Sequence, residues 1–442
     1  AQGTLPGQRV QGGAGPWWAA TVVMKTKSAG CEDAQAGLMS TVWTWWPLLL
    51  GHALEWYDFA IYGYLASSIQ ANFFRGSSLA TWLGFSVTFL VRPAGGLVLG
   101  RVADVAGRRA MTILSITGMT VATVGQGLLP SYACCGELAG AAGLYLLLGL
   151  RALQGLSAGG EVCAVAAYFA ERAPRRQLAV AMAASTAFAV AAFLLADGAA
   201  AALVAVLGKE KMVRWGWRLP YLAALPPALL SLWGRHRLGE TEAFLREQRR
   251  TPGSAEEPAQ PGTPAGSVDC QALRQFLGSH GCAALVGFGA CAGVATSFYM
   301  GLVWCPTHLK KLGMDPTVAG CIGVLANFVA ILTMLLFARL GDSIGIGCIK
   351  LIGTACGTLL GLPLFAALSS NPSSAAVGLL CVSLGYGAVA GVQLSVAYLF
   401  AAELFPTPTR ALGFALTYNL ALAVFGGLSG ILAEASLRAS PL

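Results

Sequence analysis

Apolar stretches long enough to cross a lipid bilayer recur along most of this 442-residue chain. Eleven are recognisable, at about 43–74, 79–101, 110–130, 141–170, 178–207, 217–235, 277–305, 317–340, 347–368, 374–404 and 411–434. Each holds roughly 20 residues or more, which suits a hydrocarbon core about 30 Å thick. Because lipid offers backbone groups no hydrogen-bonding partner, each stretch is expected to be helical. The sequence therefore predicts an all-α integral membrane protein with about eleven spans.

The composition agrees with a membrane protein and argues against other classes. Hydrophobic residues make up 56% of the chain and charged residues 11%, against roughly 25% charged in a typical soluble domain. The net charge of +8 is not gathered into one basic patch, so we expect no nucleic-acid partner. The 12 cysteines show no CxxC or Cys/His ligand spacing. We therefore expect no metal, no cofactor, no structural disulfide and no enzymatic activity.

One hydrophilic segment divides the spans into six and five. Residues 236–276 include arginines, glutamates and four prolines between positions 252 and 264, a composition typical of a solvated linker. We expect a flexible tail at 1–42, a six-helix bundle at 43–235, the linker at 236–276 and a bundle with five visible spans at 277–442.

The distribution of basic residues predicts the orientation in the membrane. The tail, the linker and the loops on their side carry 18 of the 28 Lys and Arg residues, Arg235 and Lys350 among them, whereas the opposite side carries 7. Because cytoplasmic loops carry the excess of Lys and Arg, the tail and the linker are expected in the cytoplasm. In the absence of a clear targeting segment, the plasma membrane is the default location.

Two short motifs recur at matching positions in the two halves. One pairs Asp with Gly three residues later and returns after 238 residues; the other pairs Glu with Pro and returns after 232 residues. The copies begin at Asp104 and Asp342, and at Glu171 and Glu403. Their agreement in spacing predicts an internal duplication. Since duplicated six-helix halves give twelve spans and eleven are visible, we expect that the last helix is missing from this chain.

Two acids lie inside the first apolar stretch, within the sequence GHALEWYDFAIYG at 51–63. Glu55, Asp58 and Tyr62 recur at i, i+3 and i+7, so they share one helical face. An acid at that depth costs about 2.5–3.5 kcal/mol even on a mild scale, which indicates a functional role. We expect this face to look onto a proton or substrate path. His52, one turn away, either titrates near neutral pH or replaces an amide donor.

The fourth span carries a second polar stripe. Arg151, Gln154 and Glu161 fall within about 80° of one another around a helix. These residues are expected to bind a polar solute, to couple to a proton, or to pair across helices with Glu55 or Asp58. Small residues between them would let a neighbouring helix approach closely. These are Gly155, Ser157, Gly159 and Gly160.

Ionisable residues at depth gather in the first half, where we expect proton coupling to reside. Arg92 in the second span either snorkels to the interface or lines the cavity, and Asp197 lies in the fifth span. The second half is expected to supply aromatic and polar contacts to the substrate. The candidates are Tyr299, Asn327, Tyr386, Gln393 and Asn419.

A loop motif, GRVADVAGRR at 100–109, sits where two spans meet on the cytoplasmic side. Its glycines permit a tight turn, its acid can cap a helix, and its arginines can pair with acids or helix ends. We expect a clasp that holds one conformation shut, with simple cytoplasmic anchoring as the alternative. The second-half copy lacks the arginine pair, so its clasp is expected to be weaker. The candidate gating residues are Gly100, Asp104, Gly107, Arg108, Arg109, Glu171, Asp342, Gly345 and Glu403.

With these motifs the chain resembles the major facilitator superfamily, and within it the metabolite:proton symporters. That group includes proline/betaine, α-ketoglutarate, citrate and shikimate carriers. The matching stretches are 51–63, FLVRPAGG and the loop motif within 89–109, RALQGLSAGGE at 151–161, WGWRLPY at 215–221, LGETEAF at 238–244 and AELFPTPTR at 402–410. The resemblance implies two six-helix bundles around a central cavity that opens to alternate sides. His52 stands where the family usually has Asn.

The sequence and the resemblance together predict a monomeric secondary active transporter. It would couple proton entry to uptake of a small polar metabolite, an organic acid or a zwitterionic osmolyte, by alternating access. Protonation of Glu55 or Asp58 would lower the cost of the conformational change. One alternative is a facilitative carrier without proton coupling. Another is a non-transporting receptor or degenerate paralogue that lacks the last helix.

Overall fold

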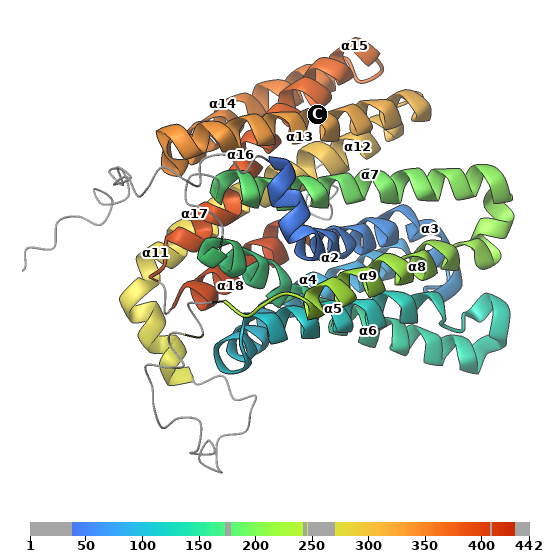
Figure 1. Ribbon diagram of the computed structural model, residues 1–442. Coiled ribbons are helices and arrows are strands. Elements are labelled where there is room, and N and C mark those ends of the chain that lie inside the picture. Colours follow the sequence, from blue (N-terminus) through green and yellow to red (C-terminus); the bar gives the residue numbers. More distant parts are fainter. Residues whose placement is uncertain (1–37, 173–177, 242–244, 246–269, 407–408, 429–442) are drawn as a thin grey trace, which may run out of the picture.

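The computed structural model describes residues 38–172, 178–241, 245, 270–406 and 409–428, and every regular element there is a helix (Figure 1). The first half contains α2 (Leu38–Tyr64), α3 (Ala66–Phe73), α4 (Ser78–Ala106), α5 (Arg108–Gly127), α6 (Tyr132–Arg172), α7 (Leu178–Lys211), η2 (Met212–Gly216), α8 (Arg218–Ala223) and α9 (Leu225–His236). The second half contains α11 (Cys270–Thr296), η3 (Ser297–Trp304), α12 (Cys305–Lys311), α13 (Pro316–Ile344), α14 (Ile346–Ser370), α15 (Ala375–Gly378), η4 (Leu379–Tyr386), α16 (Gly387–Ser395), α17 (Ala397–Glu403), α18 (Arg410–Ala421) and η6 (Leu422–Gly426).

Helices occupy all eleven stretches in which we expected them. Among the described residues, however, only 7 helices are both long and apolar enough to cross a membrane on those two criteria. Length explains part of the difference: α9 has 12 residues, and Leu412–Gly426 is likewise a short apolar helix. The described chain is therefore an all-helical protein with seven clear apolar spans.

Two helices begin before the apolar stretches expected for them, and one bond was not expected. Helix α11 begins at Cys270, inside the segment expected to be linker, and α6 begins at Tyr132, well before the apolar stretch. Cys134 and Cys135 form a disulfide, although we expected none. Adjacent cysteines are already close in space, so their pairing needs no spacing pattern that a sequence could reveal. The tail at 1–37 and most of the linker lie outside the described residues.

Helices α4 and α6 approach each other closely because α6 carries glycine at the contact. A Cβ atom on Gly155 would lie 2.3 Å from the carbonyl oxygen of Thr88, and one on Gly159 would lie 2.1 Å from that of Arg92. No side chain fits in that space, as expected from the small residues of this span. The contact fixes the position of the α4 backbone that carries Arg92.

The helices of each half pack mainly on one another. In the first half α2 packs on α7 and α9, and in the second half α13 packs on α16. The two halves meet where α7 contacts α13 and α16, and where α18 contacts α4 and α6 (Figure 1). We call this contact region the seam. Asn419 of α18 donates a hydrogen bond across it to the carbonyl oxygen of Gly159, at 2.8 Å.

Candidate functional site

An ion pair between Glu55 of α2 and Arg92 of α4 forms the centre of the candidate site. A guanidinium nitrogen of Arg92 donates to the Glu55 carboxylate, and both side chains are fully buried. The Arg92 guanidinium carbon lies 4.9 Å from the ring centre of Phe59 and 5.9 Å from that of Phe89. Arg92 therefore lies in the interior with an acid partner and does not snorkel to the interface.

Side chains of the second half surround this ion pair across the seam. The ring of Tyr398 lies 5.8 Å from that of His52, and its hydroxyl lies 3.3 Å from the hydroxyl of Tyr418. Tyr299, Tyr398 and Tyr418 are all close enough to interact electrostatically with Arg92. Tyr299 was expected to contribute here. The other two tyrosines were missed, because nothing in their local sequence distinguishes them from packing residues.

Several polar atoms of this buried centre have no hydrogen-bond partner within the described chain. They are Nε and Nη1 of Arg92, Oε2 of Glu55 and the hydroxyl of Tyr299. A buried polar group left unpaired costs about 1–3 kcal/mol, so such groups seldom gather by chance. A guanidinium with unused donors can bind a second carboxylate besides Glu55.

His52 lies beside the central ion pair and connects it to another acid. Its Nδ1 atom is 3.4 Å from Oε2 of Glu55, and it also interacts electrostatically with Glu161. Its ring meets that of Trp56 edge-on at 6.2 Å. The structure thus brings His52 and Glu55 together.

Asp58, Tyr62, Arg151 and Gln154 form a second buried cluster, which lies within the first half. An Arg151 nitrogen lies 3.9 Å from the Asp58 carboxylate, and the guanidinium carbon lies 3.7 Å from the centre of the Tyr62 ring. Arg151 also donates to Oε1 of Gln154 at 2.7 Å. All four residues come from α2 and α6, so this cluster holds first-half helices together. The expected pairing of Arg151 with Asp58 is thereby found.

Glu161 pairs with an arginine that we had placed in a cytoplasmic segment. Arg235, at the end of α9, is fully buried and donates to both carboxylate oxygens of Glu161, one bond measuring 2.9 Å. It also donates to the carbonyl oxygen of Thr112 at 2.7 Å. Gly51 makes room for it, since a Cβ atom there would lie 1.8 Å from an Arg235 nitrogen. The assignment of Arg235 to the solvated loops was wrong, because its side chain points into the bundle from the end of α9.

The loop motif is held by backbone N–H groups as well as by its arginine side chains, which donate to the carbonyl oxygens of Ala103 and His236. Gly107 has φ 95°, a left-handed conformation that favours glycine, and α5 begins directly after it. The carboxylate of Glu240 accepts hydrogen bonds from the N–H groups of Arg108 and Arg109, at 3.0 and 3.1 Å. A carboxylate at a helix N-terminus is favourable for its charge and its hydrogen bonds. Glu240 was not among the predicted gating residues, although it lies in one of the stretches that match the family.

The outcome differs among five other gating candidates. Gly345 ends α13 with φ 102°, as the tight turn requires. Gly100 has open space around its Cα, and Glu403 is exposed. The side chains of Asp104 and Glu171 lie outside the described part of the structure.

The second-half copy of the loop motif makes a contact between the halves. The Asp342 carboxylate at the end of α13 accepts hydrogen bonds from the N–H groups of Ala179 and Val180, at 3.1 and 3.3 Å. These residues begin α7, so an acid of the second half caps a helix of the first. We expected a weaker clasp here because the arginine pair is missing. The contact found needs no arginine.

We predict that Asp342→Ala loosens the start of α7. Loss of a charged acceptor should let the amides of Ala179 and Val180 exchange with solvent about tenfold faster, equivalent to about 1.4 kcal/mol. Hydrogen exchange followed by mass spectrometry of the peptide that spans the start of α7 measures this directly.

Asp315→Ala provides the matched control, because Asp315 caps the other end of the same helix. Its carboxylate accepts hydrogen bonds from the N–H groups of Thr317 and Val318, at 2.9 and 3.0 Å, and these bonds lower the pKa of Asp315. Exchange at the start of α7 should be unchanged in this variant. Equal exchange in Asp342→Ala and the wild type would show that the clasp contributes nothing.

The remaining candidates lie away from the central ion pair. Asp197 of α7 is half-buried and lines a groove of about 450 Å³ against the first turns of α13. Tyr386 and Asn327 donate to carbonyl oxygens of the second half at 2.7 and 2.9 Å, and Gln393 donates to Ser297 at 2.8 Å.

Lys350, which we had counted in a cytoplasmic loop, is instead buried and donates to a backbone carbonyl at 3.0 Å. Within the described ranges no His, Cys, Asp and Glu side chains gather in a way that could hold a metal ion.

Comparison with known proteins identifies the class. The profile of the Major Facilitator Superfamily matches residues 48–433. A double-tryptophan variant of the xylose transporter XylE superposes with a TM-score of 0.71 over 90% of both chains, at 17% identity. XylE from E. coli in a partially occluded inward-open conformation gives 0.62, at 16% identity, over 89% of this chain and 96% of that one. The chain belongs to the major facilitator superfamily and is a multi-pass integral membrane protein, not an enzyme.

Sequence relatives place the chain more closely, among the metabolite:proton symporters. It is 30% identical to the ectoine/proline transporter ProP of Corynebacterium glutamicum over 409 residues, which cover 89% of this chain and 78% of that protein. It is also 30% identical to the glycine betaine/proline/ectoine/pipecolic acid transporter OusA of Dickeya dadantii, over 85% of this chain and 74% of that one. The proline/betaine transporter of Salmonella typhimurium is 29% identical over similar ranges. The resemblance inferred from the motifs is thus confirmed.

Proposed function

We propose that this protein is a proton-coupled symporter of small zwitterionic solutes of the proline, glycine betaine and ectoine type. Its relatives are transporters of such solutes, and the central site offers a cation and an acid side by side at the seam. Arg92 can bind the carboxylate that these solutes share, and Glu55 can take up a proton. The relatives named above transport proline, glycine betaine, ectoine or pipecolic acid, which favours a zwitterionic solute over an organic acid.

The architecture proposed with this function is two bundles that rock about the seam. They comprise residues 43–235 and 277–442, with the tail at 1–42 and the linker at 236–276 in the cytoplasm of a monomer at the plasma membrane. The eleven helical stretches, the repeated motifs and the contact of Asp342 with the start of α7 support this arrangement. Here α9 and α18, although short, complete the eleven spans.

The observation that carries the proposal is the Glu55–Arg92 pair with unused donors on Arg92. The carboxylate of an entering solute competes with Glu55 for the guanidinium. Once the solute is bound to Arg92, Glu55 is an unpaired buried acid and takes up a proton. Proton and solute therefore promote each other's binding, as symport requires.

The competition between solute and Glu55 for Arg92 also determines the net charge that crosses the membrane with each solute. The empty site holds one acid and one base and is neutral, whereas the loaded site holds Arg92, a neutral Glu55 and a neutral zwitterion. Transport of solute is therefore expected to carry one positive charge inward. Both the membrane potential and the pH gradient would drive accumulation.

Glu55 is the better candidate for the coupling acid than Asp58. Glu55 lies next to His52, whose ring contacts Tyr398 of the second half, whereas Asp58 contacts Arg151 within the first half. A coupling group must sense both the solute and the state of the two halves. Glu55 meets both conditions. Asp58 and Arg151 are proposed to keep the first bundle rigid, as is Glu161 with Arg235.

Uptake by proteoliposomes tests the proposal. Radiolabelled glycine betaine and proline should accumulate when the outside is acidic, and an inside-negative potential should increase the accumulation. Succinate and shikimate should not accumulate. Entry of betaine at the same rate with and without either gradient would instead identify a facilitative carrier.

A further inference from the structure

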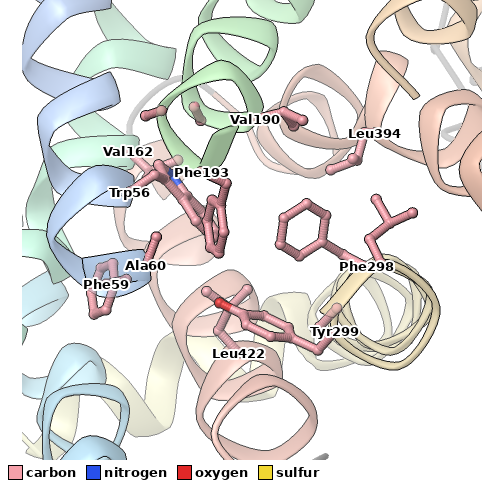
Figure 2. Close-up of a cluster of buried hydrophobic side chains, with 14 of the residues drawn as sticks. Trp56, Phe59, Ala60, Val162, Val190, Phe193, Phe298, Tyr299, Leu394 and Leu422 are labelled. Atoms are coloured by element: carbon pink, nitrogen blue, oxygen red, sulfur yellow. The ribbon is translucent and has the colours of Figure 1, made fainter. Parts of the chain in front are cut away.

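Three aromatic rings from both halves face one another at the seam, beside the central ion pair. Trp56 of α2 and Phe193 of α7 come from the first half, and Phe298 of η3 comes from the second (Figure 2). The ring centres of Phe298 and Trp56 are 5.9 Å apart, those of Phe298 and Phe193 5.3 Å, and those of Trp56 and Phe193 5.8 Å. The interplanar angles are 71°, 77° and 46°, so the rings present their faces in different directions.

Tyr299 connects these rings to Arg92. Its ring lies 5.3 Å from that of Phe298 and 6.0 Å from that of Phe89, and Arg92 lies over Phe89. Figure 2 shows the Tyr299 hydroxyl on the side of its ring that faces Phe59, whose ring Arg92 also covers. Among the residues that the structure describes, this hydroxyl has no hydrogen-bond partner, and Tyr299 is 7% exposed. A donor for an anion and a set of aromatic faces thus lie side by side.

We propose that Trp56, Phe193 and Phe298 bind the ammonium group of the solute, while Arg92 and Tyr299 bind its carboxylate. The inference rests on the proposed symport and specifies its site. The face of an aromatic ring attracts a cation, and desolvated rings do so most strongly. Glu55 cannot neutralise the ammonium, because it is protonated in the loaded state. The site should therefore favour N-methylated ammonium groups, which form no hydrogen bonds and suit apolar walls.

The origin of the rings in both halves connects binding to the conformational change. When the halves separate at the seam, Phe298 moves away from Trp56 and Phe193, and the subsite opens. In this structure the three rings contact one another, so an ammonium group reaches their faces after Phe298 moves away, and the halves then close around it. Closure over the solute is therefore favoured by the same contacts that select it.

Competition between glycine betaine and 3,3-dimethylbutanoate tests this subsite. The two have the same shape and carboxylate, but a carbon replaces the charged nitrogen in the second. Wild-type protein should bind betaine about 5- to 30-fold more tightly than the carbon analogue. Phe298→Leu and Phe193→Leu should each reduce that ratio several-fold, mainly by weakening betaine, whereas Phe298→Tyr should keep it. Binding of radiolabelled betaine to purified protein, with the analogue as competitor, measures both affinities.

Phe73→Leu is the matched control, because Phe73 is equally buried but packs edge-on against Trp217, within the first half. The ratio of the affinities for betaine and the carbon analogue in Phe73→Leu should equal that of the wild type. The subsite would be overturned if Phe298→Leu and Phe193→Leu lost affinity for both ligands equally. It would also be overturned if the ratio of the affinities for betaine and 3,3-dimethylbutanoate were unchanged in both variants. Proton-driven betaine uptake by the wild type would persist in that case. If the wild type neither bound betaine nor coupled it to protons, the proposed function itself would fail.

Discussion

Glu55→Gln is expected to abolish accumulation of solute driven by a pH gradient. With one proton per solute, a gradient of one pH unit supports an accumulation of about tenfold, because it supplies about 1.4 kcal/mol. Glutamine cannot release a proton, so the variant should only equilibrate solute, at a ratio of about one. Its exchange of external for internal betaine should persist, since Arg92 stays available for the solute. Time courses of betaine uptake in proteoliposomes at fixed gradients give these ratios.

Glu137→Gln is the control for this variant. Glu137 also forms an ion pair with an arginine, Arg75, but both side chains are largely exposed at the surface. Its removal should leave accumulation unchanged, because exposed pairs contribute little. Accumulation of betaine by Glu55→Gln at the wild-type ratio would remove Glu55 from the coupling mechanism and direct attention to Asp58.

Arg235→Met is expected to be the most destabilising substitution among the buried ion pairs. It leaves the Glu161 carboxylate without a partner in the interior, which typically costs about 3–5 kcal/mol. Arg235 also donates to the carbonyl oxygens of Thr112 and Pro47, so it connects α9 to α5 and α2. Unfolding in sodium dodecyl sulphate, followed by circular dichroism, compares the variant with the wild type.

A double variant separates the charge from the packing. Glu161→Gln with Arg235→Met removes the uncompensated carboxylate, so it should recover a large part of the lost stability. Arg75→Met, at the exposed pair with Glu137, should change stability by less than about 1 kcal/mol. If the single Arg235 variant were as stable as the wild type, the buried pair would not be a structural element.

The helices were predictable because an apolar segment in lipid must satisfy its own backbone hydrogen bonds, and a helix does so. Apolar runs bounded by charged loops located every helical stretch, and the short motifs identified the family. The acids of the first stretch could also be recognised as functional candidates, because a carboxylate such as Glu55 is costly within an apolar span. The pairing of Glu55 with Arg92 could not be predicted from the sequence, because the two residues come from different helices.

Basic residues near helix ends were the main source of error. Arg235 and Lys350 stand next to hydrophilic segments, so a count of loop charges includes them. Whether such a side chain points to water or inward depends on a local space such as the one Gly51 leaves for Arg235. The aromatic rings of the seam were hidden for a different reason. Phe298 and Trp56 look like ordinary packing residues until the fold brings the halves together.

Proton uptake on solute binding tests the central claim most directly. Purified protein in weakly buffered detergent solution, mixed with saturating betaine, should take up about one proton per solute bound, and its affinity should rise as the pH falls. In Glu55→Gln, betaine should still bind but without proton uptake and with little dependence on pH. Proton uptake of the same size in that variant, or none in the wild type, would contradict the competition between solute and Glu55 for Arg92.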